Sequence, residues 1–544
     1  MSSAPGQTNG RYADAPARSL YALPAEPAAA HVPSLIDAIV EATAVSGPAH
    51  KEQPSVPPAE PELQPQIQPQ QALALLELFL QEPSPAKALA LWLSGSAAPG
   101  APLGKHQVAR ILGRDIARLD TLLSAQVNAI LHHPRFQQIE ASWRGLRYLV
   151  EQLTGDENLK IRVLSISKRE LFKDADRAIE FDQSQIFKKV YEMEFGMPGG
   201  EPYGLLIGDY EFTNHPEDVD LLTKMSGVAA AAFAPFITGV QPSVFGMDQF
   251  TSLEQPLNLP RTFEQPDYVK WKAFRDTEDA RFVGLALPRV LMRLPYEDDG
   301  TRADGFRFRE TTAWPDRSEY LWGNAAYAFG AVVVRSFARS HWLADIRGVA
   351  RGVEGGGLVA GLPVHSFSTD KRGVAPKCST DVIITDLQEP ELSDLGFIPL
   401  CHCKDTGLSA FYANQSAQKP KKYDDLAATL NAKISSMLQY TLCVSRFAHY
   451  LKSITRDKVG AFSDPERCED YLHRWLQRYV VSDGEASAEI KAERPLREAR
   501  VRVREHPGKP GSYLCTAHLW PHFELDELAA TLKVTTELIP GRAV

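Results

Sequence analysis

The chain has 544 residues, 44% of them hydrophobic, a formal net charge of −9 and a pI near 5.9. This length exceeds what one hydrophobic core normally organises, so we expect two or three domains. The acidic balance argues against a nucleic-acid-binding protein, because such proteins carry a basic footprint.

The sequence contains no apolar run long enough to cross a bilayer, and its first residues lack the pattern of a signal peptide. Six cysteines in so long a chain do not form a disulfide framework and fit a reducing compartment. We therefore expect a cytoplasmic protein without direct membrane insertion.

The N-terminal part divides into an arm and a helical region. Residues 1–70 hold twelve of the 39 prolines, which predicts a disordered arm. Residues 71–155 show helical periodicity. The strongest apolar stripe recurs every three or four residues, at Val108, Ile111, Leu112, Ile116, Leu119, Leu123, Val127 and Ile130. Pro134 ends this helix and a second stripe follows from 136 to 153, so we predict a helical hairpin.

The central region, residues 156–425, alternates strand and helix patterns. Residues 159–163 alternate apolar and basic side chains, which predicts a half-buried strand. Ser167 and Glu170 form a capping box that starts a helix. A second helix carries Ile186, Phe187, Val190 and Tyr191. The glycine-bounded residues 203–207 predict a strand buried on both faces, which completes a βαβ-like unit.

Further elements continue the alternation along the chain. We predict helices at 216–233, around Trp271 and at 320–337, and strands at 236–240, 282–287, 381–385 and 396–403. This order favours a mixed or parallel sheet, so the predicted fold class is α/β, of the mixed α+β kind.

The C-terminal region, residues 426–544, begins with a long helix over 426–454 and a second helix from Pro465. β-structure follows at 499–503 and 513–520. Arg500, Arg502 and Arg504 lie opposite Val501 and Val503, which indicates a solvated or subunit-facing strand. A final alternating strand is predicted at Leu532, Val534, Thr536 and Leu538. Such a strand can pair within its own sheet or extend a neighbour's.

Two patterns in the sequence are candidate enzyme sites. The glycines at 355–357 with Ala360 match the dinucleotide G-x-G-x-x-A pattern, but no convincing strand precedes them, so a flexible loop or close backbone packing is favoured. The Cys/His groups, Cys378 with Cys401, His402 and Cys403, and Cys515 with His518 and His522, lack paired C-x-x-C spacing. Buried free thiols are the favoured interpretation. The sequence thus predicts no catalytic, cofactor or metal site.

Many short sequence segments, in the same order along the chain, resemble the large subunit of the type VI secretion contractile sheath, the TssC/VipB family, also called ImpC/EvpB. In the first half they are 123–126 (Leu-Ser-Ala-Gln), 130–134 (Ile-Leu-His-His-Pro), 142–146 (Ser-Trp-Arg-Gly-Leu), 199–204 (Gly-Gly-Glu-Pro-Tyr-Gly), 208–210 (Gly-Asp-Tyr) and 278–281 (Glu-Asp-Ala-Arg). Later ones are 321–326 (Leu-Trp-Gly-Asn-Ala-Ala), 396–400 (Gly-Phe-Ile-Pro-Leu), 445–452 (Ser-Arg-Phe-Ala-His-Tyr-Leu-Lys) and 507–513 (Pro-Gly-Lys-Pro-Gly-Ser-Tyr). The resemblance covers roughly 119–538, and the first hundred residues match nothing in it.

The resemblance implies a structural protein with a phage-tail-sheath-like C-terminal module. Members of the family pair with a small sheath subunit of TssB/VipA type and form a helical polymer around an Hcp inner tube on a baseplate. Contraction propels tube and spike, and a ClpV-type AAA+ ATPase disassembles the sheath. We therefore expect a sheath subunit and no enzyme. A phage-tail-like sheath of another injection machine, and less so a nucleotide- or metal-dependent enzyme, are the alternatives.

Two subunit contacts are predicted. The hairpin stripe, with Leu112, Leu119, Leu123 and Val127, is the candidate contact for the small subunit, and its alternative interpretation is intramolecular core. The terminal strand with Leu532, Val534, Thr536 and Leu538 is the candidate exchange strand between subunits, since backbone pairing through flexible linkers survives a large rigid-body shift.

Overall fold

The computed structural model describes residues 69–96, 104–153, 158–255, 257–301, 305–312, 317–349, 355–365, 378–404, 406–457, 465–484, 486–505 and 513–522. The chain divides into two compact units between Pro102 and Leu103. The first unit contains α2 (Pro69–Gln81) and α3 (Pro85–Ser96), where the rings of Phe79 and Trp92 lie 5.3 Å apart. Since α4 and α5 belong to the second unit, the helical region 71–155 is not one compact body. The predicted arm lies outside the described residues up to residue 68.

A six-stranded mixed sheet organises the second unit. Its strand order is β1 (Leu206–Phe212), β2 (Phe236–Val240), β3 (Val283–Leu287), β7 (Ile398–His402), β8 (Ser409–Phe411) and β6 (Leu358–Val359). The pairs β1–β2, β2–β3 and β3–β7 are parallel, whereas β8 runs antiparallel to both β7 and β6. The predicted α/β class with a mixed sheet is therefore confirmed.

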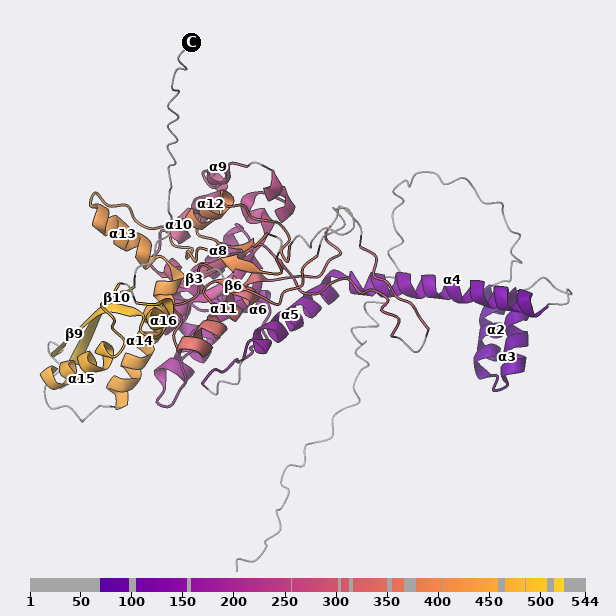
Figure 1. Ribbon diagram of the computed structural model, residues 1–544, viewed down its shortest axis with the longest axis horizontal. Helices are drawn as coiled ribbons and strands as arrows, with labels where there is room; N and C mark the ends of the chain where they lie inside the picture. Colours follow the sequence, from indigo (N-terminus) through magenta and orange to yellow (C-terminus); the bar gives the residue numbers. More distant parts are fainter. Residues whose placement is uncertain are drawn as a thin grey trace, which may run out of the picture. The chain divides into compact units, whose positions relative to one another are not determined.

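Helices cover both faces of this sheet because its strand side chains alternate between two cores. On β3, Val283, Leu285 and Leu287 face a core shared with α6 (Lys168–Arg177), α8 (Pro216–Ala232) and α10 (Val269–Arg275). Ala286 faces the opposite core, shared with α5 (Pro134–Glu151), α11 (Ala325–Ser340) and the start of α14 (Leu438–Asp457). Figure 1 shows α5 beside α11. The result is a three-layer arrangement with the sheet in the middle.

A third core joins the C-terminal elements. It contains Trp342, Phe447, Leu472, Val501 and Val503, from the segment after α11, from α14, from α15 (Pro465–Gln477) and from β9 (Leu496–Glu505). β9 pairs antiparallel with β10 (Tyr513–Pro521). Trp342 and Phe447 stack with their ring centroids 4.1 Å apart. These yellow and orange elements lie together in Figure 1.

The remaining helices and strands complete the described chain. They are α4 (Lys105–Leu131), η1 (Phe181–Gln183), α7 (Gln185–Phe187), the π-helix η2 (Lys188–Gly196), η3 (Pro242–Phe245), η4 (Phe250–Glu254), α9 (Leu259–Thr262), η5 (Pro266–Tyr268), η6 (Asp279–Phe282), β4 (Val290–Leu291), β5 (Trp322–Gly323), α12 (Gln388–Asp394), α13 (Leu426–Ser435) and α16 (Ala488–Glu493). None of the described helices combines the length and apolarity that spanning a membrane requires.

The predictions of helix ends that depend only on neighbouring residues are confirmed. Ser167 caps α6 as predicted, since its hydroxyl accepts the Glu170 N–H and Glu170 accepts the Ser167 N–H at 2.9 Å. α8 begins at Pro216 and ends at Ala232, and the capping residue Phe233 that follows adopts a left-handed φ of 50°. Capping and proline signals depend only on neighbouring residues, so the sequence locates them well.

Three predicted elements near the sheet are wrong. Residues 159–163 are extended but belong to no strand, because they do not reach a partner's backbone among the described residues. The strand predicted at 203–207 is instead β1, at 206–212, and it forms the edge of the sheet with partly buried side chains. Residues 381–385 form no strand, because the chain turns away after one bridge between Val290 and Thr380.

The long helix predicted over 426–454 is two helices, α13 and α14. The break lies at Ser436 and Met437, where Met437 forms a bridge with Gln415 and the Leu438 N–H donates to the Asn414 carbonyl at 2.8 Å. Apolar periodicity continues across the break, so the pattern alone gave no sign of it.

Candidate subunit-contact surfaces

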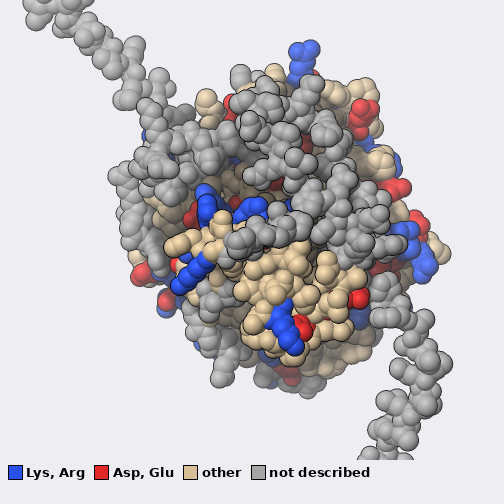
Figure 2. Space-filling view, turned by 90° about the vertical axis from the view of Figure 1, so that its right-hand side faces the viewer, with Lys and Arg blue, Asp and Glu red and all other residues tan. Residues whose placement is uncertain are grey.

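Helix α4 presents an apolar stripe that the rest of the described chain does not cover. The helix is 27 residues long and has no buried residue. Leu119 and Leu123 are 45% and 51% exposed, while Leu112 and Val127 are partly buried. In the view of Figure 2, residues other than Lys, Arg, Asp and Glu (tan) lie among basic side chains (blue) and acidic side chains (red). The α4 stripe is thus not buried among the described residues, and a contact with another chain stays a prediction.

Helix α5 behaves differently, and the predicted helical hairpin is wrong. Its inward face, with Ala141, Tyr148 and Leu149, is buried in the core shared with α11. Gly145 permits this contact, because a Cβ there would lie 2.4 Å from the Tyr327 ring. The stripe predicted between 136 and 153 is not this inward face, because its members Ile139, Trp143 and Val150 are exposed.

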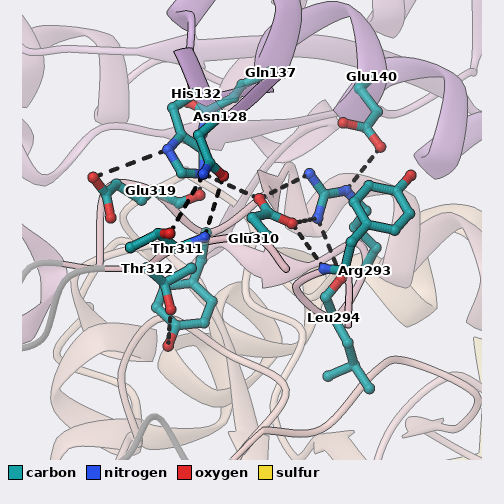
Figure 3. Close-up of polar contacts among 12 residues, drawn as sticks. Asn128, His132, Gln137, Glu140, Arg293, Leu294, Glu310, Thr311, Thr312 and Glu319 are labelled. Carbon is teal, nitrogen blue, oxygen red and sulfur yellow. Dashed lines mark hydrogen bonds and ion pairs between the residues drawn. The ribbon is translucent and has the colours of Figure 1, made fainter. Parts of the chain in front are cut away.

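A buried ionic cluster fixes the junction between α4 and α5 to the core (Figure 3). Arg293, with a side chain only 7% exposed, donates to Glu140 at 2.9 Å and to Glu310 at 2.5 Å. Glu310 also accepts the Tyr296 N–H at 2.9 Å and lies 3.1 Å from His132 Nε2. Burial opposes ionisation of Glu310, but these donors outweigh it and lower the pKa of Glu310 to about 2.

A second contact holds the end of α4. The Asn128 carboxamide accepts the Thr311 N–H at 3.2 Å, and its nitrogen lies 3.4 Å from the Thr311 hydroxyl. Figure 3 shows Asn128, His132 and Glu140 approaching this loop from the helices. The C-terminal end of α4 is thus held at a defined position on the second unit, so the exposed stripe is presented from a fixed base.

The C-terminal hairpin carries the predicted alternation of β9. Val501 and Val503 are buried, whereas Arg500, Arg502 and Arg504 are exposed. Among the described residues β10 pairs only with β9, so its other edge is open to a further strand. The candidate exchange strand, with Leu532, Val534, Thr536 and Leu538, lies outside the described residues. Its role stays a prediction.

The glycine-rich loop is used for close packing. The Gly357 N–H donates to the Gly348 carbonyl at 2.8 Å, and the Phe411 N–H donates to the Gly357 carbonyl at 2.9 Å. A Cβ on Gly357 would lie 2.1 Å from the Phe411 oxygen. The Gly356 N–H donates to Asp345 at 3.2 Å. These amides already have acceptors, which favours the packing interpretation over a phosphate cradle.

The Cys/His groups give no metal geometry where the structure describes them. No cluster of three or more His, Cys, Asp or Glu side chains is placed to hold an ion among the described residues. Burial raises the pKa of Cys401 to about 12, which keeps this thiol protonated. Cys378 is likewise buried, and its Sγ lies 3.1 Å from the Thr380 carbonyl.

Sequence reasoning missed the residues that position the α4–α5 junction. Arg293 and Glu310 lie more than 150 residues beyond Glu140 in the chain, in a segment to which no element was assigned. A single sequence carries no signal for pairing at such separation. Arg293 and Glu310 stand out only because they are charged residues that are buried in an irregular segment. Burial is a property of the tertiary structure, so the sequence does not show it.

Comparison with known proteins places this architecture among contractile tail sheath proteins. Residues 113–418 match the family described as "EvpB/VC_A0108, tail sheath N-terminal domain", and residues 427–538 match "EvpB/VC_A0108, tail sheath gpW/gp25-like domain". The chain is 46% identical over 426 residues to the type VI secretion system sheath protein TssC1 of Pseudomonas aeruginosa, covering 78% of this chain and 85% of that protein.

The chain is also similar to solved sheath structures, at lower sequence identity. The contracted helical sheath of the anti-feeding prophage shares 14% identity at a TM-score of 0.28, over 58% of this chain and 67% of that chain. The contracted sheath of the extracellular injection system PVC shares 12% identity at a TM-score of 0.33, over 70% and 89%. On the family matches and the 46% identity, the chain belongs to the TssC/VipB family of type VI secretion sheath proteins. It is a structural subunit of a contractile sheath.

Proposed function

We propose that this chain pairs with a small sheath subunit of TssB/VipA type and that the pairs polymerise in the cytoplasm as a helical sheath. In this proposal the sheath surrounds an Hcp inner tube on a baseplate and contracts to propel tube and spike. A ClpV-type AAA+ ATPase then disassembles it, so the chain itself has no catalytic role. The observation that carries the pairing is the open apolar stripe of α4 on its fixed base.

The α4 stripe suits a helix or strand of another protein. Exposed apolar residues at three- and four-residue spacing form a ridge that a second amphipathic element can cover. Ile116 and Leu122 extend the ridge, at 56% and 60% exposed. A solvent-exposed ridge of this size is costly in a free monomer, which supports a permanent partner.

The first experiment is co-expression of the full chain with the small sheath gene from the same locus, followed by electron microscopy of the high-molecular-weight fraction. We expect hollow tubules that require both chains. A folded chain that yields no tubules with its small subunit would contradict the proposal and return attention to adaptor or enzyme functions.

The α4 contact has its own test. The double substitution Leu119→Glu and Leu123→Glu should abolish co-purification with the small subunit and leave the melting temperature of the isolated chain within a few degrees. Thr121→Glu with Ala125→Glu, which adds the same two charges on the opposite side of α4, is the matched control and should retain binding. Unfolding of the double variant, with a folded control, would instead support the core interpretation.

We further propose that the strand around Leu532, Val534, Thr536 and Leu538 links subunits. The open edge of β10 supports a role for this region in strand pairing, since an unpaired edge accepts backbone hydrogen bonds from another segment. Deletion of residues 530–544 should abolish sheath formation and leave a folded subunit that still binds the small subunit. Normal sheaths from the truncated chain would refute this role.

Experiments can distinguish the proposed function from its alternatives. A sheath of another injection machine would form tubules without type VI partners. A nucleotide-dependent activity would require the loop amides at Gly356 and Gly357, which already donate to Asp345 and Gly348. Metal analysis and a nucleotide thermal-shift assay on the purified chain test the enzyme alternatives, and we expect no bound metal and no shift.

A further inference from the structure

A long groove separates β1 from the extended segment 159–166. Its volume is about 1810 Å³, and Val163 on one side and Ile207 on the other are among its lining residues. Small-molecule pockets usually enclose roughly 300–1,000 Å³. The groove is therefore of a size that suits a segment of polypeptide.

Both sides of the groove present unpaired backbone. β1 is the edge strand of the sheet, and the bond from Leu206 N–H to Pro235 directs the backbone groups of Leu206 toward β2. A register shift between Gly208 and Glu211 then interrupts this pairing. Ile207, which precedes this shift, consequently presents its N–H and C=O groups to the groove. Across it, residues 159–165 make no backbone–backbone hydrogen bond among the described residues. Each side therefore offers the edge of a strand.

Side-chain contacts, and no ladder of backbone hydrogen bonds, join β1 to residues 159–166 among the described residues. The order of these contacts along the two segments shows that the segments run parallel. Lys160 and Arg162 form ion pairs with Glu201, just before β1. At the other end the Tyr210 hydroxyl donates to the Ile166 carbonyl at 2.8 Å, and Lys168 donates to the Glu211 carbonyl at 2.8 Å. Neighbouring strands lie about 4.8 Å apart, so one inserted strand needs sides separated by about 9.6 Å. The reach of a tyrosine or lysine side chain fits such a separation, whereas a direct ladder does not.

The walls of the groove define the chemistry of its occupant. Leu146, Leu149 and Val334 form an apolar wall on the side of α5 and α11. Arg135 and Arg446 are also among the lining residues. The Arg446 guanidinium lies 5.5 Å from the Phe337 ring centroid, and its buried Nε has no hydrogen-bond partner among the described residues. An extended segment with alternating apolar side chains and an acidic residue opposite Arg446 complements these walls.

We propose that this groove accepts one β-strand of the small sheath subunit, which pairs with β1 on one side and with residues 159–165 on the other. The inference rests on the proposed heterodimer. The groove is continuous with exposed apolar surface of α5, since Ile139 and Trp143, 39% and 68% exposed, also line it. α5 directly follows α4, so one partner can occupy both surfaces. Pairing on two sides buries both strand edges at once.

Photo-crosslinking in the complete heterodimer tests the occupant. A benzophenone amino acid is placed at position 163, where Val163 is 70% exposed, and at position 179 as a control, where Ile179 is 89% exposed and does not line the groove. We expect position 163 to crosslink to an extended, alternating segment of the small subunit and position 179 not to. Crosslinks to residues 523–544 of this chain would show that its own tail fills the groove and would overturn the proposal.

Proline substitution provides a second, independent readout. Val163→Pro removes an N–H that makes no backbone hydrogen bond among the described residues, so the isolated chain should melt as the native chain does. Its affinity for the small subunit should fall at least about tenfold, whereas Val163→Thr, which keeps the N–H, should bind normally. Unchanged affinity of the proline variant would overturn the groove proposal alone. Failure of the native chain to bind the small subunit would instead refute the proposed function on which it rests.

Discussion

Removal of Arg293 tests whether the buried ionic cluster anchors the α4–α5 junction. The Arg293→Leu variant leaves Glu310, with a side chain 1% exposed, and Glu140, with one 13% exposed, without their shared guanidinium. Breaking one side of a buried ion pair costs about 3–5 kcal/mol, because the remaining charge stays desolvated. We expect that cost to appear as local opening of the junction.

Hydrogen exchange measured by mass spectrometry on peptides covering 128–140 and 305–312 reports this opening. A cost of about 3 kcal/mol corresponds to roughly a hundredfold faster exchange of protected amides, since each 1.4 kcal/mol is about tenfold. The double variant Arg293→Leu with Glu310→Leu should recover much of the protection against exchange, because it also removes the buried Glu310 carboxylate that loses its Arg293 partner.

A surface pair supplies the matched control. Lys270 and Asp220 form an ion pair at 3.0 Å with both side chains more than half exposed, so Lys270→Leu should cost at most about 1 kcal/mol. Exchange in Arg293→Leu that rises less than about fivefold, or a double variant no better protected than the single one, would refute the anchoring role.

Three further outcomes are expected. Gly357→Ala should lower the melting temperature markedly, because its Cβ would overlap the Phe411 carbonyl, whereas Gly113→Ala, in open space on α4, should be neutral or stabilising by about 1 kcal/mol in thermal unfolding. Burial lowers the pKa of His449 to about 4 from 6.5, so the free energy of unfolding should fall as pH decreases from 6.5 to 4, because the unfolded chain binds the proton first; His449→Gln should flatten this titration. Ser167→Ala should cost about 1 kcal/mol in chemical denaturation through loss of the α6 cap, and an unchanged midpoint would contradict that contribution.

Much of the secondary structure could be predicted from neighbouring residues. The cap at Ser167, the proline at the start of α8 and the alternation in β9 are local signals, and the structure has each of them. Errors occurred where a contact with a distant residue decided the outcome. Residues 159–163 have the pattern of a strand but no neighbour to pair with, and the bridge between Met437 and Gln415 interrupts a continuous helical pattern.

The sequence by itself determined the family, the α/β class and the apolar stripes of α4 and α5, because motif order and periodicity are properties of the chain. Only the tertiary structure decided which face of each helix is buried. Gly145 allows one face of α5 to approach Tyr327, whereas Trp143 of the α5 stripe stays exposed. On α4, no described element buries Leu119 and Leu123. Burial depends on what lies across from a residue, and periodicity records only which residues share a face.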